Sequence, residues 1–432
     1  MLKDWSHVVV IYNSIENNSL KLDNNYLFSK ILVFFFVFTI VFAPSIGGYD
    51  TRYFYIFLWF FIALIKNKGN PIRIYKLDLI FLSGPIFIGG YALLIIAFTN
   101  SYDYFEVLRS FRAAIMYFII YFFIYSWNIS GRIFIKVIEN ILLIHAITIL
   151  IAIVFPEFEA IIQFISSFEK VNLPLRSTGL VSSYEGAGFL CLTGIILNSF
   201  NVYYKNKKLL NYKSFIFIIS VLFTSRTSIT VLCILILIMF VYAVISGKVK
   251  SSLNVLKYVA PLAVISLSFL ILTTNIGSEY RNEIYKYLPK LYYFFEYFDD
   301  SYTDYGKHTR AVERHIEIGD DINTINLVFG SGTRIESKDP GYIKIIYSTG
   351  IIGVIISLYI YLKSIINLRF LTKSYNYKGD LYSVLYSWVI FITLIYELKI
   401  PFIFSSVFFE LTCILYLSIL NEVRLRREVF IH

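Results

Sequence analysis

The chain has 432 residues, of which 57% are hydrophobic and only 16% are charged, and its mean hydropathy is +0.68. A soluble protein of this length could not bury so much apolar surface, so the composition excludes a soluble globular enzyme and predicts a membrane protein. The net charge is +10. Its basic residues lie in short loops between apolar runs, so the charge indicates membrane topology rather than nucleic-acid binding.

Long apolar runs recur along the whole chain and predict an all-α polytopic membrane protein. We expect a single membrane domain over residues 1–432, with about 12 transmembrane helices. The spans are predicted at residues 31–48, 52–65, 77–98, 113–130, 133–155, 187–204, 209–224, 228–246, 256–274, 341–362, 380–398 and 402–420. The three cysteines, Cys191, Cys233 and Cys413, all lie in apolar runs, so no disulfide framework is expected.

The loops between these spans differ in charge. Alternate loops, among them residues 66–76, 205–213 and 363–378, carry far more lysine and arginine than the short loops on the opposite side. This bias predicts that both termini lie in the cytoplasm. It places residues 156–187 and the long loop 275–339 outside, and a loop of that length is usually functional.

The first candidate site is the external stretch "LPLRSTGLVSSYEGAGF", residues 173–189. Arg176 precedes Ser177, Thr178 and Gly179, which offer hydroxyls and accessible backbone amides. A guanidinium with such neighbours can bind a phosphate through two parallel hydrogen bonds. The alternative is that Arg176 contacts lipid headgroups. Glu185, further along the stretch, is a candidate carboxylate.

The second candidate is the segment "FTSRTSIT", residues 223–230, at the tip of a predicted helical hairpin. Arg226 would lie at or just below the outer membrane boundary, flanked by Ser225 and Thr227. A charge at that depth needs a partner or water, and a plain turn would use Asn or Gly instead. Arg226 is therefore a functional candidate.

The third candidate lies in the long external loop, where "HTRAVERHIEIGDD", residues 308–321, predicts a short helix. Arg310 and Arg314 share one face of this helix, and His308 and His315 lie on another. These side chains are candidates for substrate binding. The alternative is a solvated helix whose arginines pair with neighbouring glutamates.

Ionisable groups also occur within the predicted spans. Glu410 lies near the middle of the last span, His145 near the middle of the fifth and Glu397 near the outer end of the eleventh. Such groups are functional candidates by default, although each could serve a structural pair. A proton-coupled transporter would use them, so transport remains an alternative. Zinc-ligand spacings and phosphate-binding glycine motifs are both missing, so no metal or cofactor is expected.

The order of these motifs resembles that of a known family. An external Arg-x-x-x-Leu (176–180) precedes a Ser-Arg-Thr hairpin (225–227), and a long external loop closes with "NLVFGSGT" (326–333) and "DPGYIKIIYSTGIIGVIIS" (339–357). The chain thus resembles the O-antigen polymerase (Wzy) family, within the superfamily that also contains the O-antigen ligases. Ligases carry a histidine near the end of the long loop. The corresponding position here is Asp339, which favours a polymerase.

The resemblance implies a GT-C-like membrane glycosyltransferase in the bacterial cytoplasmic (inner) membrane. It would transfer a growing glycan from undecaprenyl diphosphate to the next lipid-linked repeat unit, without metal or cofactor, to make O-antigen or capsule. A chain-length regulator and a flippase would be its protein partners. An O-antigen ligase and a transporter or flippase of lipid-linked oligosaccharide are the alternatives.

The resemblance and the residue chemistry together assign roles to the candidate side chains. Arg176 and Arg226 would stabilise the departing diphosphate, and Asp339 would orient or deprotonate the attacking hydroxyl. The remaining candidates are expected to bind substrate: Arg310, Arg314, His315, Glu185 and Ser177.

The topology can be tested by labelling single-cysteine variants in intact cells. Cysteines in residues 205–213 and 363–379 should be protected from a membrane-impermeant reagent, and cysteines in residues 275–339 should react, because of the charge bias between the loops. Protection of the long loop would contradict both the topology and the external site.

Overall fold

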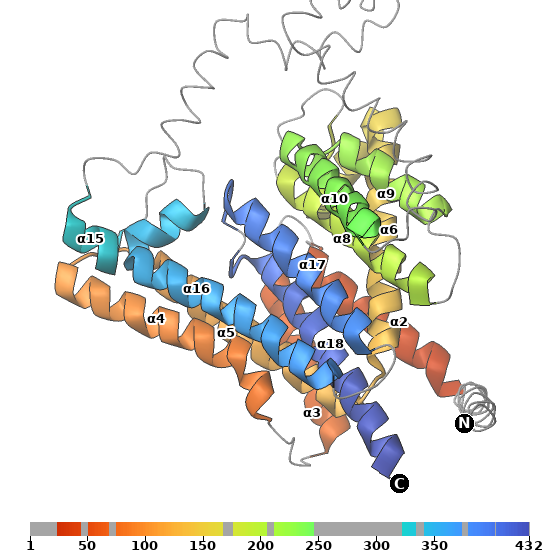
Figure 1. Cartoon of the computed structure of the whole chain (residues 1–432), viewed down its shortest axis with the longest axis horizontal. Coiled ribbons are helices and arrows are strands. Elements are labelled where there is room, and N and C mark those ends of the chain that lie inside the picture. The colour runs from red at the N-terminus through yellow and green to blue at the C-terminus, as the bar shows by residue number, and fades with distance from the viewer. Residues whose placement is uncertain are drawn as a thin grey trace, which may run out of the picture.

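The structure is a computed structural model, and it describes residues 24–44, 51–68, 75–166, 176–204, 211–245, 322–333, 341–373, 379–401 and 403–431. These residues form helices and no strand (Figure 1). The predicted span 256–274 lies outside the described residues, as does most of the long loop 275–339. The predicted all-α class is confirmed for the described part of the chain.

The helices form an elongated bundle, and their bounds follow in chain order. They are α2 (Asn24–Phe42), α3 (Arg52–Asn67), the 3-10 helix η1 (Lys76–Leu79), α4 (Ile80–Thr99), α5 (Phe105–Trp127), α6 (Gly131–Val154), α7 (Pro156–Ser166), α8 (Tyr184–Tyr204), α9 (Tyr212–Leu222), α10 (Arg226–Ile245), α15 (Thr324–Phe329), α16 (Gly341–Lys373), α17 (Gly379–Glu397) and α18 (Ser406–Ile431).

Every predicted span in the described part overlaps a helix. Within that part, four helical segments are long and apolar enough to cross a membrane: Leu77–Thr99, Phe105–Trp127, Gly131–Val154 and Gly341–Lys373. Several shorter apolar helices accompany them, so the chain has the character of a membrane protein. Several boundaries differ from the expectation: α2 begins at Asn24 rather than residue 31, and α16 and α18 end at Lys373 and Ile431 rather than at residues 362 and 420. The difference that matters for the site is in α5, which begins at Phe105 rather than near residue 113.

The two ends of the bundle are distinct in Figure 1. Helix α2 begins and α18 ends at one end, which we call the inner end, whereas α15, the start of α16 and the turn between α17 and α18 lie at the opposite, outer end. In the described part of the chain, the start of α2 and the end of α18 thus lie at the same end of the bundle. That the outer end faces outside the cell remains a prediction from the loop charges.

Ion pairs close the inner end. Arg424 on α18 donates to both carboxylate oxygens of Asp78 in η1, at 2.7 and 3.0 Å, and also to the hydroxyl of Tyr125. Arg132 at the start of α6 lies 3.3 Å from Glu422 on α18. These pairs link α18 to two neighbours, and two parallel donors from one guanidinium fix their relative orientation.

Helix α16 is interrupted at Gly350, where φ is 68° and ψ is −175°. A Cβ at this position would overlap the carbonyl oxygen of Val328, so the break requires glycine. Backbone carbonyls near the break are bound by the segment after α15: Ser331 N–H donates to Tyr347 at 2.8 Å, and Gly332 N–H donates to Ser348 at 3.2 Å. The break therefore turns residues 341–349 away from the long helix without leaving these carbonyls unpaired.

Candidate functional site

Residues 176–183, which the sequence predicts as an external loop, fold into the helix bundle. The backbone N–H of Leu180 donates to His145 Nδ1 at 3.2 Å. His145 is completely buried, its ring stacks on Phe42 at 5.4 Å, and it lies about two and a half turns before the end of α6 at Val154. His145, a candidate proton carrier by sequence, thus accepts a backbone hydrogen bond that holds this segment in place.

The small residues of this segment are buried at its turn. The Ser177 hydroxyl donates to Glu159 Oε2 at 3.0 Å and accepts from the N–H of Gly179 at 3.1 Å, and Ser177 is 1% exposed. Gly179 has φ of 54°, and a Cβ there would lie 2.7 Å from Cε1 of His145. Ser177 would reach a substrate only by leaving Glu159, so its assignment to substrate binding stays a prediction.

The two segments that carry the predicted arginines meet. Ser177 N–H donates to the carbonyl of Phe223 at 3.1 Å, directly before the turn that leads to Arg226 at the start of α10. Arg176 is half-buried, and its guanidinium lies over the ring of Tyr184, 5.9 Å from the centroid. The sequence predicted both arginines at one site, and the backbone contact brings their segments together.

The start of α8 and the α9–α10 turn are both attached to the outer end of α17. Glu185 forms an ion pair with Lys399 at 2.7 Å. On the neighbouring turn, Ser228 Oγ accepts from the hydroxyl of Tyr396 at 2.6 Å and lies 2.7 Å from Ser225 Oγ. Glu185 is therefore charge-paired in this structure, and its assignment to substrate binding is also still a prediction.

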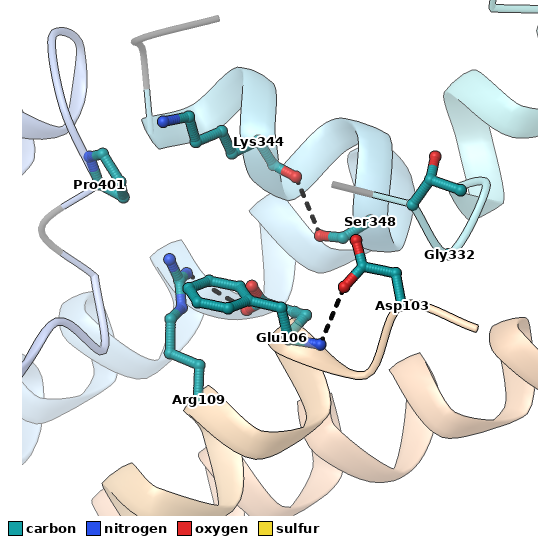
Figure 2. Close-up of a pocket in the computed structure, with 9 residues that line it drawn as sticks. Asp103, Glu106, Arg109, Gly332, Lys344, Ser348 and Pro401 are labelled. Atoms are coloured by element: carbon teal, nitrogen blue, oxygen red, sulfur yellow. Dashed lines mark hydrogen bonds and ion pairs between the residues drawn. The ribbon is translucent and has the colours of Figure 1, made fainter. Parts of the chain in front are cut away.

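A charged cavity of about 40 Å³ lies at the outer end, on the other side of the α17–α18 turn (Figure 2). It is lined by the start of α5, the first part of α16, residues 332–333 and Pro401. At its floor, Arg109 Nη2 lies 3.2 Å from Glu106 Oε1, and both side chains are buried. Lys344 adds a second cation from α16, and Asp103, whose Oδ1 accepts from the N–H of Phe105 at 3.0 Å, adds a second carboxylate just before α5.

A second pair of opposite charges lies deeper along α5 and α18. Arg112 donates to the carbonyl of Phe404 at 3.4 Å and interacts electrostatically with Glu410, which is 1% exposed. Glu410, a candidate by sequence, thus lies within electrostatic range of Arg112. Glu397 Oε2, at the end of α17, accepts from the N–H of Ile403 at 2.6 Å and so fixes the α17–α18 turn.

Sequence reasoning assigned Arg109 and Arg112 to an external loop and gave neither a role. The structure places them, with Glu106, in the first two turns of α5. The signal was available, because charges at i, i+3 and i+6 share one face of a helix, and they directly precede an apolar run. Charged residues on one face at the mouth of a span indicate a buried ionic site.

Several predicted site residues lie outside the described part: Asp339, Arg310, Arg314 and His315. Arg226 begins α10, but its side chain is also outside the description. Within the described ranges, no group of three or more His, Cys, Asp or Glu side chains is arranged to hold a metal ion.

Comparisons of the chain with protein-family models, curated proteins and solved structures find no match. Its function is therefore inferred from its residues, their geometry and the resemblance in motif order.

The contact between Gly179 and His145 gives a test of the folded segment. Gly179→Ala should lower the stability of the purified protein by about 1–3 kcal/mol, because alanine is strained at positive φ and its methyl group would press on the imidazole. The control is Gly90→Ala in α4, where a Cβ meets nothing within 4 Å. Thermal unfolding in detergent measures both. Equal unfolding temperatures for the two variants would contradict the described fold of residues 176–183.

Proposed function

We propose that this protein is a membrane glycosyltransferase that polymerises lipid-linked repeat units. The donor is a growing glycan on undecaprenyl diphosphate, the acceptor is a sugar hydroxyl on the next lipid-linked unit, and the product is O-antigen or capsule. Polymerisation would take place at the outer face of the cytoplasmic membrane. The apolar helices support the membrane location, and the motif order supports the enzyme class.

The observation that carries the proposal is the meeting of the Arg176 and Arg226 segments. They come from different parts of the chain, yet Ser177 N–H and the Phe223 carbonyl join them at 3.1 Å. Polar residues around this hydrogen bond are buried: Ser177, Thr224 and Ser225. Two arginines near one such point suit an anion that is partly withdrawn from water.

The chemistry requires little more than charge stabilisation. Diphosphate is a good leaving group, so catalysis depends on stabilising the negative charge that develops as the glycosidic bond to the lipid breaks. Guanidinium groups held in a water-poor site supply this stabilisation, and no metal is needed. Asp339 is the proposed base for the attacking hydroxyl, with Glu185, His308 and His315 as the alternative groups for accepting that proton.

Transport of a lipid-linked oligosaccharide is the second candidate, and the interrupted α16 favours it. Transporters commonly place a broken helix beside their binding site, and the break at Gly350 lies near the charged cavity, which Ser348 helps to line. A transporter would move the lipid-linked glycan without forming a glycosidic bond. The two candidates therefore differ in product.

The test uses Arg→Lys variants in a strain that lacks the gene. Lysine keeps the charge but not the planar pair of donors, so Arg176→Lys and Arg226→Lys should each lower the polymerisation rate by roughly 10²–10³. The matched control is Arg369→Lys, at an exposed arginine near the inner end of α16. Polymer length is measured on a gel, beside an immunoblot for membrane abundance.

The uncomplemented strain should accumulate single repeat units without long chains. Full-length polymer left on undecaprenyl diphosphate would instead indicate a ligase. Wild-type ladders from both site variants, at normal abundance, would contradict the diphosphate role of these arginines.

A further inference from the structure

The cavity beside α5 has a buried charged floor and an exposed rim. Glu106 and Arg109 form part of the floor, whereas Phe105 and Thr333 at the edge are exposed. Figure 2 shows Glu106 and Arg109 side by side below Lys344, which comes from the other wall. A ligand entering from the outer end would meet the cations Lys344 and Arg109, together with the carboxylates of Asp103 and Glu106.

Arg109 has unused hydrogen-bonding capacity. The side chain is 7% exposed, and its Nε and Nη2 atoms make no hydrogen bond with any residue in the described part of the chain. Its one ion pair there is with Glu106, at 3.2 Å. A guanidinium carries five N–H donors, and leaving several of them unpaired away from water is costly. An anion with several oxygens would satisfy them.

The size of the cavity limits what such an anion can be. A volume of about 40 Å³ exceeds the minimum for one water roughly threefold. The enclosed part of the cavity therefore has room for a small group of a few heavy atoms, and the rest of a larger ligand would lie outside it. Glu106 already presents a carboxylate to Arg109, so it occupies part of the place that a phosphate would take.

We propose that this cavity binds a phosphate group, and that in the polymerase it holds the diphosphate of the acceptor lipid. The second half of this statement rests on the proposed function, in which two lipid diphosphates must be bound at once. The α17–α18 turn lies between the two places: Lys399 pairs with Glu185 near the Arg176 segment, and Pro401 lines the cavity. The incoming phosphate displaces the Glu106 carboxylate from Arg109, and its oxygens accept two parallel hydrogen bonds from the Arg109 guanidinium.

The test measures binding to the purified full chain in lipid nanodiscs. The probes are farnesyl diphosphate, which carries a prenyl chain but no sugar, and inorganic diphosphate. Wild type should bind two farnesyl diphosphates per chain, and Arg109→Gln should bind one. Glu106→Gln removes the competing carboxylate, so it should bind the second molecule several-fold more tightly.

Two controls repeat the same charge changes at exposed positions. Arg369→Gln and Glu157→Gln should leave stoichiometry and affinity as in wild type, because neither residue lines the cavity. If Glu157→Gln tightened binding as much as Glu106→Gln does, the effect would be one of overall charge, and the site would be overturned.

Each remaining outcome decides between the possibilities. If Arg109→Gln bound two molecules of farnesyl diphosphate, the site would be overturned. Weaker binding of farnesyl diphosphate by Glu106→Gln would also overturn it, and this variant tests the site even if Arg109→Gln cannot be purified. If the cavity bound inorganic diphosphate as tightly as farnesyl diphosphate, it would be a site for a soluble phosphate compound, and its role in binding the acceptor lipid would be overturned. If wild type bound one molecule and Arg109→Gln none, the site would stand, and the donor role of Arg176 and Arg226 would fail.

Discussion

Backbone polar groups removed from water need partners, and the outer end of this bundle is built around that constraint. Three non-helical segments are each held there by a specific hydrogen bond. Residues 176–183 are held by His145, residues 330–332 by carbonyls beside the break in α16, and the α17–α18 turn by Glu397. These bonds satisfy backbone groups or turns that the helices themselves leave without partners. They are also the segments that border the charged side chains.

The α17–α18 turn separates two groups of charged residues at the outer end. On one side of the α17–α18 turn, the segments bearing Arg176 and Arg226 meet. On the other side, Arg109 and Lys344 line a cavity. A reaction between two lipid-linked diphosphates needs two anion sites whose prenyl chains both remain in the bilayer. Under the proposed function, the Arg176 and Arg226 segments would supply one such site, and the cavity would supply the other through Arg109 and Lys344, which share it with the carboxylates of Asp103 and Glu106.

Much of the fold could be predicted from the sequence, because apolar runs and loop charges report directly on helices in a membrane. The start of α5 at Phe105 was missed, because charged residues before an apolar run are typical of a loop, although the spacing of Glu106, Arg109 and Arg112 also fits one face of a helix. The break at Gly350 and the burial of Ser177 could not be predicted from the sequence either, because both depend on contacts with segments that are distant in the chain. For the site, the sequence singled out Arg176 and Arg226, whose segments meet, and missed the cavity around Arg109.

The most direct test of the account is a count of products in a reconstituted system. The purified protein in liposomes is given a lipid-linked repeat unit, and both glycosidic bonds and free polyprenyl diphosphate are measured over time. The account predicts one polyprenyl diphosphate released for each new glycosidic bond, with chains that lengthen stepwise. Movement of the lipid-linked unit across the bilayer, with neither bond formation nor release of the diphosphate, would contradict it and indicate a transporter.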